Sequence, residues 1–176
     1  MEENYVALIE AILFASGEPV HISKLAELIS LDKTAVRQQL SNLNEKYNNK
    51  NSGIQLLELN DNYQISTKPE FAEKVKEAVI VNRETPLSPA AMEVISIIAY
   101  NQPVTKGFVE EVRGVNSSQI VNALVEKGLI EEAGRLNVPG RPITYKTTIN
   151  FLRCFGLKNL DSLPPLPSDI EQLQFE

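Results

Sequence analysis

The chain has 176 residues, of which 43% are hydrophobic and 23% charged, and its 17 basic and 23 acidic residues leave a formal net charge of −6. Such values are typical of a soluble globular protein of one or two domains. The single histidine and single cysteine exclude an internal disulfide, and they leave too few ligands for a metal site built from His and Cys.

The first half of the chain predicts three helices followed by a β-hairpin. In chain order, we expect helices over 5–16 and 22–30, a third from the capping residue Asp32 through Tyr47, β-strands over 54–59 and 63–67, and a closing helix over 69–81. The third helix is predicted from apolar residues at helical spacing, and the strands from short β-like runs around Asn60-Asp61-Asn62.

The second half repeats this order. We expect helices over 90–100, 106–113 and 116–127, strands over 129–134 and 143–147, and a closing helix over 149–155. Ser88 is a good N-cap for the first of these helices, and Pro89 sits where a first-turn proline is tolerated. Asn116 is expected to cap the third helix as Asp32 does in the first half.

The two halves also share residues in one register. When the sequence is shifted against itself, the stretch 15–20 (Ala-Ser-Gly-Glu-Pro-Val) falls on 99–104 (Ala-Tyr-Asn-Gln-Pro-Val), and apolar positions match through the next two helices. Two long copies indicate a duplicated domain, whereas a solenoid needs three or more short repeats. Three helices and a hairpin are the order of a winged helix-turn-helix.

We therefore predict a mainly α protein with small β-hairpins (α+β), built from two tandem winged helix-turn-helix domains. The first domain is expected over 1–81 and the second over 86–159. The proline-rich tail 160–176 cannot be helical throughout, and it is interpreted as an extended strap or a flexible end.

The sequence offers little for catalysis. It has no phosphate-binding glycine loop of either common pattern, and nothing near His21 marks a nucleophile. Cys154 is expected to be a small buried hydrophobe. We expect a protein that is not an enzyme and that uses no cofactor or metal. With no apolar run long enough for a bilayer and no basic start, a cytoplasmic location is expected.

A winged helix first suggests a DNA-binding regulator, with the third helix in the major groove. The acidic balance argues against it, because affinity for DNA comes largely from neutralised phosphates. In the second copy, Gln119 and Asn122 could read bases, but few cations surround them. The first copy has Lys33, Arg37 and Gln38, which are interpreted as scattered solvated side chains. The helices 5–16 and 90–100 are apolar nearly all round, which predicts burial on more than one side, against a partner or against the other copy.

Several stretches of the second half carry a resemblance to a known family. They are 87–104 (Leu-Ser-Pro-Ala-Ala-Met through Asn-Gln-Pro-Val), Arg113-Gly-Val115, 138–148 (Val-Pro-Gly-Arg-Pro-Ile-Thr-Tyr-Lys-Thr-Thr), Phe151-Leu152 and Phe155-Gly-Leu157. The chain thereby resembles the segregation and condensation protein B family of bacteria. The resemblance covers both copies and the Leu-Pro-Pro-Leu stretch after them; the first half matches more loosely.

The resemblance implies a non-enzymatic adaptor on the nucleoid. Members are homodimers that bind the kleisin subunit, segregation and condensation protein A, and through it the Smc ATPase. They support chromosome condensation and segregation, and they contact DNA weakly or only through the assembled complex. The runner-up interpretation is a winged-helix transcription regulator.

Two sets of residues are the candidate contact sites under this resemblance. The first helix is expected to form the dimer through Tyr5, Leu8, Ile9 and Ile12. The second copy is expected to bind the kleisin through Met92, Ile95, Arg135, Arg141 and Tyr145.

The wing of the second copy is the loop from Arg135 to Pro142, and its sequence predicts local backbone structure. Pro139-Gly140 predicts a tight turn with Gly at positive φ. Arg141 is expected to be extended because it precedes Pro142, and Tyr145 is expected on a β-edge. The Arg141 side chain is interpreted either as a ligand of kleisin carboxylates or, slightly preferred, as a brace within its own domain.

Overall fold

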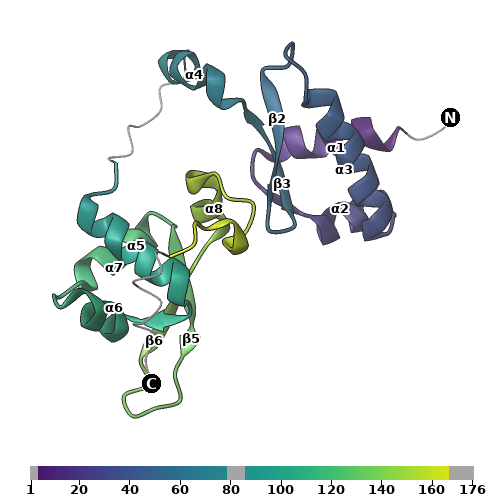
Figure 1. Cartoon of the computed structure of the whole chain (residues 1–176). Coiled ribbons are helices and arrows are strands. Elements are labelled where there is room, and N and C mark those ends of the chain that lie inside the picture. The colour runs from purple at the N-terminus through teal and green to yellow at the C-terminus, as the bar shows by residue number, and fades with distance from the viewer. Residues whose placement is uncertain (1–3, 79–85, 167–176) are drawn as a thin grey trace.

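The computed structural model describes residues 4–78 and 86–166. Two domains with the same order of elements lie side by side, and the predicted α+β fold of tandem winged helices is confirmed (Figure 1). In each domain three helices pack against a small antiparallel sheet. The two sheets have the same strand order, β1-β3-β2 and β4-β6-β5, as a duplication requires.

The N-terminal domain follows the predicted order. Its elements are α1 (Tyr5–Ser16), β1 (Val20–His21), α2 (Ile22–Ile29), α3 (Lys33–Tyr47), β2 (Ile54–Leu59), β3 (Asn62–Thr67), the 3-10 turn η1 (Pro69–Phe71) and α4 (Ala72–Ala78). The last part of the predicted closing helix, 79–81, lies outside the described residues. Asp32 caps α3 as predicted, with its Oδ1 accepting from the backbone N–H of Ala35 at 2.9 Å.

The C-terminal domain repeats the series. Its elements are α5 (Pro89–Asn101), β4 (Val104–Thr105), α6 (Lys106–Arg113), α7 (Ser118–Glu126), β5 (Ile130–Arg135), β6 (Ile143–Thr147), α8 (Ile149–Phe155) and the 3-10 turn η2 (Leu160–Ser162). Ser88 caps α5, with its hydroxyl accepting from the N–H of Ala91 at 3.2 Å.

The start of α7 differs from the prediction. The N-cap position is Ser117, whose side chain makes no capping bond, and α7 begins at Ser118. The predicted cap Asn116 still accepts from the backbone N–H of Ser118 through its Oδ1 at 3.3 Å. The Glu110 carboxylate on α6 accepts from the backbone N–H of Ser117 at 3.1 Å and from the Ser118 hydroxyl at 2.9 Å. These bonds, that to the backbone first, lower the pKa of Glu110. A carboxylate from the preceding helix thus takes part in organising this helix start.

Each domain has its own buried cluster. Ile9, Leu13, Leu25, Val36 and Leu43 are at the centre of the N-terminal core, and Val94, Ile98, Val121, Leu124 and Phe151 are at the centre of the C-terminal core. Strand β2 contributes side chains to both cores. Leu56 packs against the N-terminal core, while Leu57 and Leu59 pack with the C-terminal core.

Two local expectations about the second copy are wrong. The β6 strand, which carries Tyr145, is the central strand of its sheet, so Tyr145 is not on an edge and is only 5% exposed. Cys154 is exposed rather than buried, because it lies on the outer side of the short helix α8, and its Sγ is 3.7 Å from Asn150 Oδ1.

The described part of the tail runs back along its own domain. Leu163 packs against the C-terminal core, and the Tyr100 hydroxyl donates to the Pro164 carbonyl at 2.5 Å. The rest of the predicted flexible end, 167–176, lies outside the described residues.

Candidate partner-binding surfaces

Helix α1 has an exposed apolar stripe. The side chains that face solvent along it are Ala7, Leu8, Ala11, Phe14 and Ala15. Phe14 is 77% exposed and Leu8 39%. An exposed apolar stripe of this kind is a candidate interaction surface, and small residues beside Phe14 leave room for another backbone.

The four residues predicted for a dimer interface are divided by the structure. Leu8 is in the exposed stripe, while Tyr5 and Ile12 are half-buried at its border and pack against the N-terminal core. Ile9 is completely buried and is a core residue, which removes it from the candidate surface. Phe14, the most exposed large apolar side chain of α1, was missed, although its helical spacing from Ala7 and Ala11 is visible in the sequence.

A groove in the C-terminal domain is the second candidate surface. It has a volume of about 370 Å³ and is lined by Leu87, Met92, Leu129, Cys154 and Phe155, with Lys127 beside them. Met92 is 40% exposed and Phe155 36%. The groove is formed where the start of α5, the end of α7 and the end of α8 meet. Its apolar lining next to one cation fits an amphipathic segment that carries a carboxylate.

A second, more apolar groove lies next to the first. Its volume is about 330 Å³, and it is lined by Leu87, Ala91, Ile120 and Ala123, again with Lys127. Leu87 and Lys127 line both grooves and so stand between them. Together the two grooves form a continuous candidate surface along α5 and α7, which we call the α5–α7 surface.

The residues predicted for kleisin binding are not brought together. Met92 lines the α5–α7 surface, but Ile95 is only 1% exposed and belongs to the core. Tyr145 is buried in the central strand, and its ring lies 5.7 Å from Lys106 Nζ. Arg135 and Arg141 are on the wing at the end of the β5–β6 hairpin.

The wing is held by its own backbone. Arg141 N–H donates to the Val138 carbonyl at 2.9 Å, and Gly140 has φ +83°, which confirms the predicted tight turn. Arg141 is not extended as expected but has φ 41°, because it closes this turn before β6 begins at Ile143. The Arg135 guanidinium donates to the Arg141 carbonyl at 3.0 Å, so Arg135 is the residue that braces the wing, while the Arg141 side chain is exposed.

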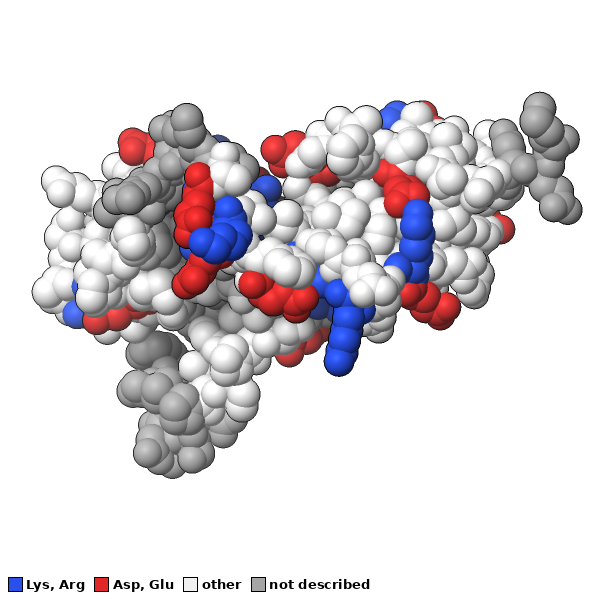
Figure 2. All heavy atoms as spheres, turned by 90° about the horizontal axis from the view of Figure 1, so that it is seen from above, with Lys and Arg blue, Asp and Glu red and all other residues white. Residues whose placement is uncertain are grey.

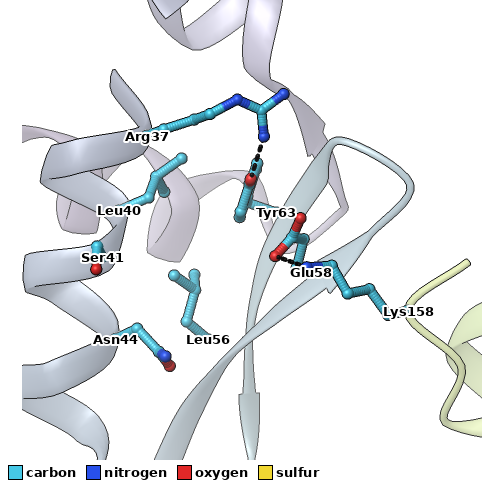
Figure 3. A pocket seen from close by; sticks show the side chains of 8 residues that line it. All are labelled: Arg37, Leu40, Ser41, Asn44, Leu56, Glu58, Tyr63 and Lys158. Carbon is cyan, nitrogen blue, oxygen red and sulfur yellow. Dashed lines mark hydrogen bonds and ion pairs between the residues drawn. The ribbon is translucent and has the colours of Figure 1, made fainter. Parts of the chain in front are cut away.

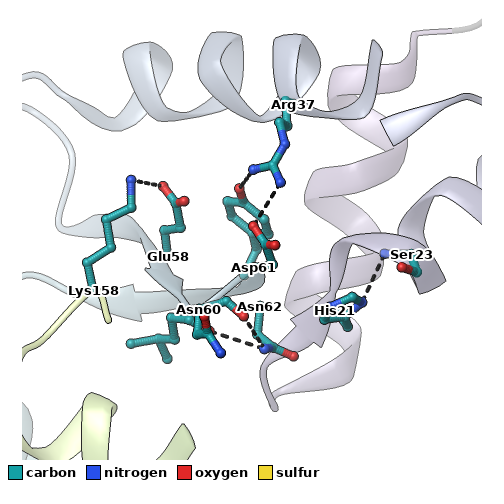
Figure 4. Close-up of polar contacts among 10 residues, drawn as sticks. His21, Ser23, Arg37, Glu58, Asn60, Asp61, Asn62 and Lys158 are labelled. Atoms are coloured by element: carbon teal, nitrogen blue, oxygen red, sulfur yellow. Dashed lines mark hydrogen bonds and ion pairs between the residues drawn. The ribbon is translucent and has the colours of Figure 1, made fainter. Parts of the chain in front are cut away.

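Two side chains of the third helices that could contact nucleic acid, Arg37 and Asn122, have partners within the protein. Arg37 on α3 forms an ion pair with Asp61 at 2.8 Å and donates to the Tyr63 hydroxyl at 3.3 Å (Figure 4). The hydrogen bond that the Arg37 guanidinium donates to the Asp61 carboxylate lowers the pKa of Asp61. On α7, Asn122 accepts from Lys106 Nζ at 2.6 Å. The cations visible on the face drawn in Figure 2 lie beside acidic side chains, so this face is mixed in charge.

Arg37 also borders a groove between the domains. With a volume of about 420 Å³, it is lined by α3 residues Leu40, Ser41 and Asn44, by Tyr63 on β3, and by Lys158 of the C-terminal domain (Figure 3). Burial is the main cause that raises the pKa of Tyr63.

No group of three or more His, Cys, Asp or Glu suited to a metal ion occurs among residues 4–78 and 86–166. Within the same described ranges, the helices are too short or too polar to cross a membrane.

The fold defines a tandem winged-helix protein, with an exposed apolar surface in each domain. The chain matches the family model described as segregation and condensation complex subunit ScpB over residues 7–166, and it belongs to that family. Segregation and condensation protein B of Ruminiclostridium cellulolyticum is 46% identical over 162 residues, covering 92% of this chain and 85% of the relative. That of Acetivibrio thermocellus is 45% identical over 158 residues, covering 89% and 80%.

Two solved structures are also similar. The crystal structure of ScpB from Mycobacterium tuberculosis has 31% sequence identity and a TM-score of 0.42, covering 87% of this chain and 95% of that one. A crystal structure of a dimer of the ScpB N-terminal domain complexed with a ScpA peptide has 29% identity and a TM-score of 0.41, covering 42% of this chain and 93% of that one.

Proposed function

We propose that the chain is a homodimeric, non-enzymatic adaptor of the bacterial Smc–kleisin complex. It binds the kleisin ScpA, acts through it on the Smc ATPase at the nucleoid in the cytoplasm, and supports chromosome condensation and segregation. Family membership supports the role as a segregation and condensation subunit. The observation that carries the binding role is the presence of two separate exposed apolar surfaces, one in each domain.

We assign the dimer contact to the stripe on α1. A second copy placed against Phe14 and Leu8 covers apolar side chains that the N-terminal domain itself leaves in water. Covering such area is favourable by about 25 cal/mol per Å² before the entropy of association is subtracted. The small residues Ala7, Ala11 and Ala15 permit close helix packing.

We assign the kleisin contact to the α5–α7 surface. An amphipathic segment fits there by placing apolar side chains against Leu87, Met92 and Phe155 and a carboxylate near Lys127. Arg135 and Arg141 lie on the wing and do not line this surface, so the proposed contact does not include them. The alternative receptor is the N-terminal domain, the part of ScpB that is seen with a ScpA peptide in the solved complex.

The test is a calorimetric titration of the whole chain with ScpA, combined with a light-scattering mass of the free protein. We expect a mass of two chains and saturable binding that Met92→Glu weakens and Phe14→Glu does not. If Met92→Glu binds normally while substitutions in the N-terminal domain abolish binding, the kleisin contact lies in the N-terminal domain and our assignment to the C-terminal domain is wrong. If ScpA does not bind the folded chain at all, the adaptor proposal itself is wrong.

A further inference from the structure

The two domains are joined by more than the chain that links them. Strand β2 belongs to the N-terminal domain, yet Leu59 at its end is only 3% exposed because it is buried with the C-terminal core. Leu57 packs on the same core, whereas Leu56, which points to the opposite face of the strand, packs on the N-terminal core. One strand is therefore covered on both faces, by a different domain on each.

Polar contacts continue this junction at the hairpin end. The backbone N–H of Asn60 donates to the Lys158 carbonyl at 2.8 Å, and Lys158 Nζ lies 2.9 Å from the Glu58 carboxylate (Figures 3 and 4). The ion pair is partly exposed and contributes little to stability by itself. The backbone hydrogen bond from Asn60 to Lys158 fixes how the hairpin end lies against the segment after α8, because a hydrogen bond requires a short distance and a near-linear angle.

Both sides of the junction are anchored to their own domains. On the hairpin, Asp61 pairs with Arg37 of α3, and its carbonyl accepts from the N–H of Ile22 at 2.9 Å. On the other side, Leu157 N–H donates to the Leu152 carbonyl at 2.9 Å directly after α8. Neither side can therefore move freely with respect to its own core.

We propose that residues 57–60 of the β2–β3 hairpin and residues 157–158 after α8 form an interdomain clamp. The clamp fixes the C-terminal domain in one orientation to the N-terminal domain. The stripe on α1 and the α5–α7 surface are then held at a constant separation and angle, so that the chain is a rigid arm. The corresponding hairpin of the second copy does not do this, because its end, 136–141, is exposed.

The clamp is tested by measuring the distance between the domains with paired spin labels in the whole protein. One label is attached to the exposed Cys154 and the other to a cysteine introduced by Glu45→Cys on the exposed side of α3. An excess of unlabelled protein suppresses distances between copies. The unmodified junction should give one narrow distance peak, and Leu57→Gln/Leu59→Gln should lose it in favour of a broad distribution.

Two controls accompany this variant. Leu56→Val on the opposite face of β2 and Glu27→Lys on the remote helix α2 should both keep the narrow peak. If the double leucine variant loses helical content by circular dichroism, Leu57→Gln alone replaces it, because Leu57 is only partly buried against the C-terminal core. It should also broaden the peak. A broad distribution in the parent protein, or an unchanged peak in the well-folded junction variant, overturns the proposal.

Discussion

Glu10 of α1 and Tyr47 of α3 are joined by a 2.5 Å hydrogen bond from the tyrosine hydroxyl to the carboxylate. Lys46 Nζ lies 2.7 Å from the other oxygen of the same carboxylate. The hydrogen bond from Lys46, followed by that from Tyr47, lowers the pKa of Glu10, and burial is the first cause that raises the pKa of Tyr47. The polar edge of α1 is thereby fastened to α3, which leaves the apolar stripe of α1 facing outward.

This cluster predicts a dependence of stability on acid. The folded-state pKa of Glu10 lies below its usual value near 4.3. The stability gained from its ionised form is present above that value and is lost as the pH falls through the folded-state pKa. Urea unfolding between pH 7 and pH 3 should therefore show Glu10→Gln to be less stable than the parent at neutral pH, with the difference shrinking in acid. Tyr47→Phe should reduce the same acid dependence, and a pH-independent difference contradicts this assignment.

The stripe on α1 predicts a dimer that single charges disrupt. Phe14→Glu and Leu8→Glu place a carboxylate on surface that a second copy would cover, and desolvating an unpaired carboxylate is costly. Light scattering at micromolar concentration should show one chain per particle for these variants and two for the parent. Phe71→Glu is the matched control, since Phe71 is 40% exposed in the same domain but lies outside the stripe. A dimer that survives both stripe substitutions excludes this face.

Sequence periodicity identified nearly all helices and strands, because helix caps, the Pro-Val steps and the repeated register all agree on the same fold. Periodicity did not predict the local backbone correctly where two neighbouring residues favour different conformations or capping positions. Arg141 precedes a proline and was expected to be extended, but the turn made by Pro139 and Gly140 requires φ 41° there. Asn116 accepts from the Ser118 N–H, yet the N-cap position is Ser117, whose own N–H donates to Glu110 of the preceding helix.

The surfaces were harder to predict than the elements. An apolar helix such as α5 shows which residues are apolar but not which side meets its own core, so Met92 and Ile95 looked equivalent and only Met92 is exposed. Phe155 and Leu129 join Met92 only through tertiary packing. The interdomain junction left a signal in the Ile54–Leu59 run, which is apolar on both faces of the strand, but the sequence does not say what covers the second face.

The engaged cations predict weak binding to DNA. Arg37 is paired with Asp61, and Asn122 accepts from Lys106, so two of the side chains of α3 and α7 that could meet phosphates or bases already have partners. A fluorescence anisotropy titration with short duplexes should show weak, salt-sensitive binding without sequence preference. Specific binding tighter than about 10⁻⁸ M at physiological salt, the range of operator proteins, contradicts the adaptor proposal and favours a transcription regulator.

Cys154 gives a chemical test of the α5–α7 surface without a substitution. Its side chain is exposed and lines the same groove as Met92 and Phe155. Alkylation with a bulky maleimide should fill part of the groove and weaken ScpA binding, whereas the small methylthio group should have a lesser effect. Circular dichroism confirms that the modified protein is folded. Prior binding of ScpA should slow the alkylation, and an unchanged rate in a saturated complex contradicts the proposed site.

Met92 and Ile95 should separate binding from folding, although they are neighbours on one helix. Met92→Glu changes a side chain that is 40% exposed, so its effect on unfolding should stay within about 0.5 kcal/mol. It places a carboxylate in the groove where apolar side chains of the kleisin are expected, and we predict a loss of affinity of about tenfold or more. Ile95→Ala removes buried atoms and should cost about 2–5 kcal/mol of stability.

The decisive comparison is made at a temperature at which both variants are folded. There Ile95→Ala should bind ScpA nearly as well as the parent, because its side chain does not reach the surface, whereas Met92→Glu should bind weakly. Met92→Leu, which keeps an apolar side chain of similar size, should restore most of the affinity. If Ile95→Ala weakens binding as much as Met92→Glu in fully folded protein, the receptor surface is not the groove beside Met92.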